Sequence, residues 1–406
     1  MSDTRPVVAH LVHHYAAPTE TFVVNQVESI SRYRVFVGCH HRHRDSLYPL
    51  VDGVAAVDRL GPAARRLDRL AYARFALPTP FTASALAHSI TAQNPVLAHV
   101  HYLSDACYFR GTLRRLGVPF IISGYGYDVS WFPQRARGLA GVLLRRAFRE
   151  ASAVLAMSQD MQGDLIKLGC APEKIIIHYH GSDASRFAMA EPRDPRAGEI
   201  RLLACGRLAE KKGLEITLEA LAILRDRGVA GWRLTVIGDG PRRPGIESLI
   251  ARLDLGERVH LAGHLPYTGP ELPARYHEAD VLVQPSVWTA DGDKEGIPGV
   301  IVEGMASGLA VVASRHAGIP AVIEDGVSGL LVPERDPVAL AAALERLLQD
   351  DALRRRLGST AAQRAVDEFD LRVRTPVLES IYDRVAGRER SEESLAPSAR
   401  ETVSTR

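Results

Sequence analysis

Short apolar runs rich in β-branched residues alternate with longer amphipathic stretches along almost the whole chain. In the first half, the apolar runs predict strands at residues 7–12, 34–40, 96–101, 120–123, 153–157 and 174–179. Helical periodicity predicts helices between them, at residues 20–31, 105–116 and 139–151. Strands that alternate with helices in this way build parallel sheets from βαβ units.

The second half repeats this alternation after a segment, 191–198, whose two prolines, glycine and alternating charges are typical of a linker. It predicts strands at 200–205, 232–237, 259–262, 281–284 and 310–313, and helices at 214–227, 246–253, 272–279 and from about 298. Helices at 338–348, 351–368 and 372–385 follow. From about 387 the apolar period is lost, and we expect a disordered tail.

These patterns predict two Rossmann-like α/β domains. The first covers residues 1–190 and the second 198–370, with a C-terminal helix at about 371–386 and a disordered tail at 387–406. A length of 406 residues agrees with two domains, because single hydrophobic cores rarely grow beyond about 250–300 residues.

Composition and charge narrow the functional class. A formal net charge of +2 gives no case for nucleic-acid binding, and the four cysteines lack metal-ligand or disulfide spacing. The first residues lead directly into a strand pattern, so we expect no signal peptide. No run of about 18 apolar residues indicates a membrane-spanning helix, and the expected location is the cytoplasm.

The most informative segment is the helix start near residue 298. Pro298 suits the first position of a helix, and Gly308 suits the cap beyond its end. Backbone amides at such a helix start attract phosphate at the carboxyl edge of an open α/β sheet. Here these amides belong to Gly299, Val300 and Ile301.

Two carboxylates, Glu295 and Glu303, flank this helix start. A carboxylate accepts two hydrogen bonds at once, so these residues suit ribose and hexose hydroxyls better than a diphosphate. Glu303 is the single charged residue between positions 298 and 314. From the residues alone, an ordinary solvent-facing glutamate explains Glu303 as well as a binding role does.

A second candidate phosphate element follows the strand at 200–205. Gly206 allows close approach of the backbone, and Arg207 and Lys212 could bring positive charge to a diphosphate; a solvated basic loop is the alternative. The turn with Gly238 and Gly240 follows the next strand but lacks the complete Gly-x-Gly-x-x-Gly spacing. A dehydrogenase is therefore disfavoured.

Together these residues resemble glycosyltransferase family 4, a group of retaining enzymes with the two-domain GT-B fold. The motifs that carry the resemblance are Glu295 and Glu303 separated by seven residues, Gly-Arg-Leu-Ala-Glu-Lys-Lys-Gly at 206–213, Gly-Asp-Gly-Pro at 238–241, His-Ala-Gly-Ile-Pro at 316–320 and Asp-Gly-Val-Ser-Gly at 325–329. The resemblance implies two domains facing a central cleft, with the C-terminal helix returning to the first domain.

For the donor, the resemblance implies a nucleotide sugar linked to UDP or GDP. Glu303 would hold the ribose and Glu295 the sugar, while Arg207 and Lys212 would grip the diphosphate. It also implies that no metal is needed. The sequence Asp-Gly-Asp at 291–293 looks like a metal motif of another glycosyltransferase fold, but its position beside the glutamate pair argues against that role.

In the first half, His-Val-His-Tyr at 99–102 looks like the strand end of the family whose second histidine, here His101, contacts the transferred sugar. Tyr125 and Asp128 lie in a segment that resembles the wall of the acceptor cleft, although many members have histidine in place of Tyr125. Thr19 and Glu20 occupy a loop where many members have Gly-Gly, and we assign them to the acceptor side.

The resemblance favours a subgroup that assembles bacterial exopolysaccharide, capsule or lipopolysaccharide, with a saccharide or lipid-linked acceptor. Basic stretches at 59–74 and 145–149 could contact an anionic membrane, or they could be solvated helix faces. Two alternatives share the architecture: a nucleotide-sugar 2-epimerase and a non-catalytic nucleotide-sugar-binding protein.

Ala321 departs from the family, which often has glutamate after Gly-Ile-Pro.

Overall fold

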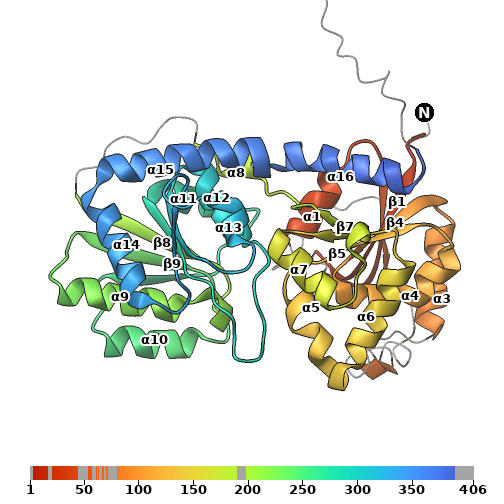
Figure 1. The fold of residues 1–406 in the computed structure, drawn as a ribbon, viewed down its shortest axis with the longest axis horizontal. Helices are drawn as coiled ribbons and strands as arrows, with labels where there is room; N and C mark the ends of the chain where they lie inside the picture. Colours follow the sequence, from red (N-terminus) through yellow and green to blue (C-terminus); the bar gives the residue numbers. More distant parts are fainter. Residues whose placement is uncertain are drawn as a thin grey trace, which may run out of the picture.

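In the computed structural model, the described residues are 3–16, 21–43, 54–56, positions 61, 63, 66, 67, 70 and 71, and 80–189 and 198–388. They form two α/β domains that lie side by side (Figure 1). Most of the expected linker at 191–198 and of the expected tail lies outside the described residues, as do Thr19 and Glu20.

The first domain is built on a seven-stranded parallel sheet with the order β3-β2-β1-β4-β5-β6-β7. The six predicted strands are confirmed, and β3 is an addition because three residues are too few to show a pattern. The strands are β1 (Val7–Tyr15), β2 (Arg34–Arg42), β3 (Val54–Ala56), β4 (Pro95–His101), β5 (Phe120–Ser123), β6 (Ala153–Ala156) and β7 (Ile175–Ile177).

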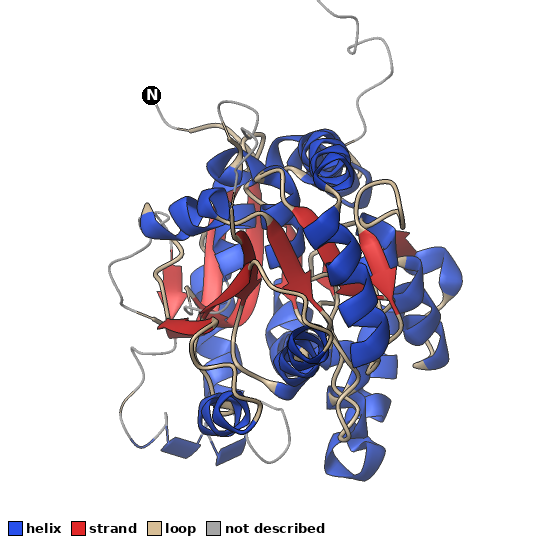
Figure 2. Ribbon diagram, turned by 90° about the vertical axis from the view of Figure 1, so that its left-hand side faces the viewer, coloured by secondary structure: helices blue, strands red, loops and turns tan. Residues whose placement is uncertain are grey.

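Helices of the first domain connect most of these strands. Figure 2 shows the strands of the molecule between helices on both sides. Ser158 caps α7, because its hydroxyl accepts a hydrogen bond from the Met161 amide at 3.2 Å. The helices are α1 (Thr21–Ser29), α3 (Pro80–Thr91), α4 (Leu103–Leu116), α5 (Tyr127–Ser130), α6 (Leu139–Glu150), α7 (Gln159–Lys167) and α8 (Ala184–Phe187), with 3₁₀ turns at Phe132–Gly138 and Pro172–Lys174.

The second domain has a six-stranded parallel sheet with the order β10-β9-β8-β11-β12-β13. All five predicted strands are confirmed, and the three-residue β13 was missed for the same reason as β3. The strands are β8 (Ile200–Cys205), β9 (Trp232–Ile237), β10 (Val259–Gly263), β11 (Val281–Gln284), β12 (Ala310–Ser314) and β13 (Leu330–Val332).

The helices that follow β8 along the chain are close to the predicted ranges, with three differences. The four-residue α13 was not predicted. Pro298 precedes α12 as its cap, since its ψ of 120° is still extended, and the predicted helix 351–368 ends in a π turn, Ala365–Phe369. The helices are α9 (Leu214–Asp226), α10 (Arg243–Arg252), α11 (Glu271–Glu278), α12 (Gly299–Ala306), α13 (Ile319–Val322), α14 (Pro337–Gln349), α15 (Asp351–Arg364) and α16 (Leu371–Val385), with a 3₁₀ turn at Glu210–Lys212.

Both sheets reverse their strand order once. In the first sheet the chain runs outward from β1 through β2 and β3, then places β4 on the other side of β1. In the second sheet β8 and β11 are related in the same way. A crevice forms at such a reversal, outside the carboxyl ends of the two neighbouring strands, and open α/β sheets bind ligands there.

The last helix, α16, lies against the first domain (Figure 1). The hydroxyls of Ser29 and Thr375 are 2.7 Å apart. The Glu379 carboxylate accepts hydrogen bonds from the backbone amides of Ser31 and Arg32. Among the described residues, no helix combines the length and apolar character needed to cross a membrane.

Candidate active site

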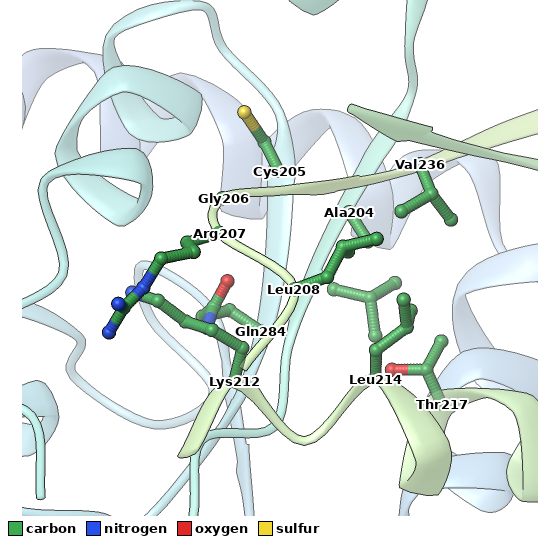
Figure 3. A pocket seen from close by; sticks show the side chains of 11 residues that line it. Ala204, Cys205, Gly206, Arg207, Leu208, Lys212, Leu214, Thr217, Val236 and Gln284 are labelled. Carbon is green, nitrogen blue, oxygen red and sulfur yellow. The ribbon is translucent and has the colours of Figure 1, made fainter. Parts of the chain in front are cut away.

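A pocket opens at the strand reversal of the second sheet, where β8 and β11 end (Figure 3). Its lining includes Gly206, Arg207, Lys212 and Gln284. The side chains of Arg207 and Lys212 extend in the same direction (Figure 3). The two cations predicted for a diphosphate are therefore brought together at one edge of the sheet.

Glycines make this edge possible. Gly206 and Gly238 have φ angles of 137° and 135°, a region that side-chain-bearing residues rarely adopt. A side chain at Gly238 would collide with the carbonyl oxygen of Gly206. The turns after β8 and β9 thus pack backbone against backbone, which leaves room beside the strand ends for a ligand.

Glu295 reaches this pocket through an ion pair. The Lys212 ammonium lies 2.8 Å from Oε1 of Glu295, whose side chain is only 9% exposed. Burial opposes ionisation of this carboxyl, yet the ammonium groups of Lys212 and Lys211 together hold its pKa below the ordinary value. Glu295 is therefore an ionised acceptor of hydrogen bonds at neutral pH.

His316, for which the sequence predicted no role, accepts a hydrogen bond from the backbone of Glu295. The backbone amide of Glu295 donates to Nε2 of His316 at 3.1 Å, and Nδ1 of His316 lies 2.8 Å from the Glu334 carboxylate. Since Nε2 accepts, the His316 proton lies on Nδ1. His316 opens a family motif in the sequence, but no sequence signal pointed to Glu334.

Glu303 projects from α12 and is buried, with 8% of its surface exposed. The Tyr276 hydroxyl on α11 donates to its Oε2 at 2.7 Å. Burial raises the pKa of Glu303 to about 7, although the hydrogen bond from Tyr276 acts in the opposite direction. This burial rules out the solvent-facing alternative for Glu303.

The helix start beside Glu303 differs in one respect from the expectation. The amide of Ile301 donates to the Pro298 carbonyl at 3.0 Å, so it is already occupied. The amides of Gly299 and Val300 are the better candidates for phosphate contact at this turn. Gly299 also lies near Glu303, since a Cβ there would be 3.8 Å from Oε1.

In the first domain, His101 ends β4 and is completely buried. Its Nδ1 lies 2.7 Å from the Tyr125 hydroxyl, and its Nε2 lies 2.8 Å from Nδ1 of His10. Burial lowers the pKa of His101 well below its ordinary value, so the ring is neutral. Contact of His101 with a sugar would require it to exchange one of these partners.

Asp128 holds the loop that carries Tyr125. Its Oδ1 accepts from the amides of Tyr125 and Gly126, and its Oδ2 accepts from the Leu103 amide. The carboxylate is fully buried. The direct acceptor contact that we expected of Asp128 gains no support, because its carboxylate already accepts from backbone amides of its own loop and of Leu103. It positions Tyr125, which is partly exposed.

The two domains meet at this loop. A side chain at Gly296 would collide with the carbonyl oxygen of Tyr125, so the segment 294–296 lies directly against the loop of the first domain. Next to it, the buried Lys294 ammonium pairs with Asp160 at 2.6 Å and with Asp164, both on α7. These interdomain pairs were not predicted, because nothing local in the sequence joins positions so far apart.

Both carboxylates of the Asp-Gly-Asp sequence at 291–293 have side-chain partners. Asp293 forms an ion pair with Lys211 at 3.0 Å. Asp291 accepts a hydrogen bond from the Thr289 hydroxyl at 2.5 Å. Both carboxylates thus help to order the loop that leads into Glu295.

Two family models match the chain. Residues 20–186 match "Glycosyltransferase Family 4", and residues 199–350 match "Glycosyl transferases group 1". The boundary between the two matches falls between the two sheets of the structure.

Curated relatives and solved structures agree with these matches. The amylovoran biosynthesis glycosyltransferase AmsK of Erwinia amylovora is 39% identical over 59% of this chain, and the chain spans 58% of that relative's length. A GDP-mannose-dependent phosphatidylinositol monomannoside mannosyltransferase of Mycolicibacterium smegmatis is 30% identical, with 64% of this chain and 69% of that protein covered.

Among solved structures, HepE of Anabaena in complex with UDP superposes with a TM-score of 0.74 at 19% identity. The superposition covers 93% of this chain and 100% of HepE. At this identity the likeness concerns the fold, which is GT-B. The matched models and the relatives together show that the chain belongs to glycosyltransferase family 4.

Proposed function

We propose that this protein is a retaining glycosyltransferase that moves a hexose-type sugar from a UDP- or GDP-sugar to a saccharide or lipid-linked acceptor. The observation that carries the proposal is the site at the reversal of the second sheet. There, the cations Arg207 and Lys212 line the pocket, and an ionised Glu295 pairs with Lys212. The buried Glu303 projects from α12, which packs against β11. That combination matches the charges and hydroxyls of a nucleotide sugar.

In this proposal, each part of the donor has its own partner. Glu303 accepts hydrogen bonds from the ribose hydroxyls, and Glu295 accepts them from the sugar. Arg207 and Lys212 contact the diphosphate, and Lys212 can do so while still beside Glu295, since an ammonium has three donors. HepE, which has a similar fold, was solved with UDP-glucose, and we extend a nucleotide-sugar donor to this chain.

The proposed chemistry places the protein's charges where the reaction develops charge. When the bond between the anomeric carbon and the phosphate breaks, negative charge grows on the diphosphate. Arg207 and Lys212 stabilise that charge electrostatically. We propose attack on the same face as the departing diphosphate, which also takes the acceptor proton. No resident metal is needed in this scheme, because the two cations neutralise the leaving group.

We further propose that the product enters a cell-surface polysaccharide, by extension from AmsK, whose name places it in amylovoran biosynthesis.

Helix α6 supports a contact with an anionic membrane that carries the acceptor. Leu139 and Val142 are 46% and 38% exposed, and Arg145, Arg146 and Arg149 are exposed on the same helix. Charge reversal of these arginines should weaken liposome binding, and unchanged binding would remove the membrane contact. In a cell, this contact would place the enzyme on the cytoplasmic face.

The experiment that tests the function is a panel of UDP-, GDP- and ADP-sugars, scored for thermal stabilisation and for slow release of nucleotide without acceptor. One stabilising donor with released nucleotide supports a transferase and identifies the donor. Conversion of the free donor into its 2-epimer would instead indicate an epimerase. Stabilisation by a donor that stays intact with all acceptors would indicate a binding protein.

A further inference from the structure

Three buried histidines meet at the strand reversal of the first sheet. His10 lies on β1, and His99 and His101 lie on β4; all three are 0% exposed. Their ring nitrogens come within 4.8 Å of one another. The family resemblance drew attention to His101 alone, so the other two rings require their own explanation.

The rings form part of one continuous series of hydrogen bonds. The Ser123 hydroxyl contacts Nε2 of His99 at 2.7 Å, and Nδ1 of His99 contacts the Tyr382 hydroxyl at 2.7 Å. The Tyr382 hydroxyl also contacts Nε2 of His10 at 3.3 Å. From His10 the chain continues through His101 to the Tyr125 hydroxyl.

The number of protons available to this series of hydrogen bonds restricts which nitrogen of each histidine ring carries a proton. Burial holds the pKa of His10 at about 3 and those of His99 and His101 well below their ordinary value, so each ring is neutral and carries one N–H proton. A neutral ring donates from one nitrogen and accepts at the other. If Tyr382 donates to one histidine and accepts from the other, every bond in the chain must point in the same direction.

Only two arrangements satisfy this condition. In the first, Ser123 donates into the chain, all three histidines carry their proton on Nδ1, and His101 donates to the Tyr125 oxygen. In the second, Tyr125 donates into the chain and all three carry their proton on Nε2. Any mixed arrangement would place two donors or two acceptors face to face, either at the buried Tyr382 hydroxyl or between His10 and His101, at the cost of an unsatisfied polar group.

We propose that Tyr382, on the C-terminal helix α16, is a positioning residue for the His101–Tyr125 pair, because it joins the three histidines into one chain with a shared tautomer. The direction of these hydrogen bonds then determines whether the Tyr125 hydroxyl can donate a hydrogen bond to a sugar or only accept one. When His101 donates, the Tyr125 hydroxyl accepts from the ring, and it would act as a donor towards a sugar oxygen. When Tyr125 donates to His101, its oxygen can only accept from a sugar hydroxyl.

Tyr382 is well placed for this role. Its side chain is completely buried, and its helix is fixed to the first domain through Thr375 and Glu379. The ring of Tyr33 packs edge-on against it with centroids 5.4 Å apart. The helix that follows the second domain thus supplies one member of a site in the first domain. The consequence for the reaction rests on the proposed function, whereas the shared tautomer does not.

Nuclear magnetic resonance of ¹⁵N-histidine-labelled protein tests the proposal, because ring ¹⁵N shifts distinguish the two tautomers. Signals are assigned from variants that lack each ring in turn. In the unaltered protein we expect His10, His99 and His101 to share one tautomer. Mixed tautomers would overturn the proposal without any variant. So would purified protein that holds stoichiometric zinc on these rings, since metal ligation would replace the chain.

Tyr382→Phe removes the joining hydroxyl, and Tyr33→Phe is the matched control. The Tyr33 hydroxyl donates to Asp383 at 2.7 Å, on the same helix but outside the chain. Tyr382→Phe should uncouple His99 from the other two rings and shift their ¹⁵N signals, whereas Tyr33→Phe should leave all three unchanged. Identical histidine spectra in Tyr382→Phe and the unaltered protein would overturn the proposal.

Steady-state kinetics with the donor identified above tests the effect on the reaction. We expect Tyr382→Phe to lower kcat roughly five- to tenfold, as loss of one hydrogen bond would, with the donor KM unchanged. An equal fall in Tyr33→Phe would indicate a merely structural role and overturn the positioning role. If the unaltered protein turns over no nucleotide sugar, the proposed function fails, while the tautomer measurement still decides the shared-tautomer proposal.

Discussion

The two sheets of this protein place different chemistry at equivalent points of the same topology. At the reversal between β1 and β4, the two strands carry neutral, buried histidines that bond to one another and to tyrosine hydroxyls. At the reversal between β8 and β11, the strand ends carry glycine turns, two cations and an ionised glutamate. The fold determines where a ligand can bind, and the side chains determine which part of the ligand each half accepts.

In the proposed function, this difference follows the chemistry that each half would recognise. A diphosphate carries charge, and it requires cations and backbone amides at close range. Sugar and acceptor hydroxyls are neutral, and a hydrogen-bonding side chain with a defined proton suits them. Substitutions in each half would reveal whether the second domain alone controls donor binding and how strongly the two halves depend on each other.

The largest effect is expected from Glu303→Ala. Each hydrogen bond from a ribose hydroxyl to a carboxylate contributes about 1.5–3 kcal/mol, so losing two should weaken donor binding about 100-fold or more. Isothermal titration calorimetry with the identified donor measures this effect. Glu324→Ala, which alters an exposed carboxylate of the same domain, serves as the control. Unchanged donor affinity in Glu303→Ala would exclude the ribose contact.

Arg207→Ala should reduce turnover about 10- to 30-fold, because one charge-assisted contact to the leaving diphosphate is lost. Arg207 is exposed and has no ion-pair partner within the described part of the chain, so the fold should not suffer. Arg201→Ala, at the opposite end of β8, is the matched control. Initial rates of nucleotide release compare the two variants, and equal rates would refute the assignment of Arg207.

How much of this site the sequence could predict depends on how far apart in the sequence the contacting residues lie. Glu295, Glu303, Arg207 and Lys212 lie within local motifs, so their placement at one sheet edge could be predicted from strand, turn and helix order. The ion pair between Lys212 and Glu295 could not, because it joins two motifs about eighty residues apart whose relative placement depends on the packing of the strands.

Partners without a local motif were missed. Tyr276 reaches Glu303 from 27 residues away, and Tyr382 reaches His99 from 283 residues away. Tyrosines in amphipathic helices usually pack in the core, so their periodicity indicates burial and says nothing of a hydroxyl partner. Asp128 is the opposite case: its motif suggested an acceptor contact, whereas the structure shows its carboxylate bonded to backbone amides of its own loop and of Leu103.

The pH dependence of donor binding tests the environment of Glu303. Burial raises the pKa of its carboxyl to about 7 in the free protein, while ribose hydroxyls favour the ionised form and lower the pKa in the complex. Donor binding therefore releases a proton between the two pKa values. Affinity should fall about tenfold as the pH decreases from 8 to 6, measured by calorimetry in buffers of different ionisation enthalpy.

Glu303→Gln provides the control for this prediction, since an amide does not titrate. Its weaker donor binding should be nearly independent of pH over this range. The stability of the free protein should depend on pH in the opposite sense to the donor affinity. Because the carboxyl pKa is raised in the folded state, the free energy of unfolding falls as the pH rises through 7. Glu303→Gln should therefore raise the melting temperature at pH 8 but not at pH 4. A pH-independent affinity of the unaltered protein would contradict the raised pKa.

The smallest effect is expected where the two halves meet. Lys294→Met removes the buried ammonium that pairs with Asp160 and Asp164 across the domain boundary. The donor site lies in the second domain and stays intact, but the approach of the Tyr125 loop to the segment 294–296 loses its electrostatic support. We expect a wider average separation of the domains by small-angle X-ray scattering and a donor KM raised about threefold, equivalent to about 0.7 kcal/mol.

Lys167→Met is the matched variant for this comparison, because Lys167 pairs with the same Asp164 at 3.1 Å but within one helix. It removes a surface cation from that carboxylate without touching the second domain, and exposed pairs of this kind contribute little. If Lys294→Met and Lys167→Met give the same scattering profile and the same KM, the ion pairs of Lys294 do not hold the domains together. The close backbone packing of Gly296 against Tyr125 and Gly126 would then hold the two domains in contact without these ion pairs.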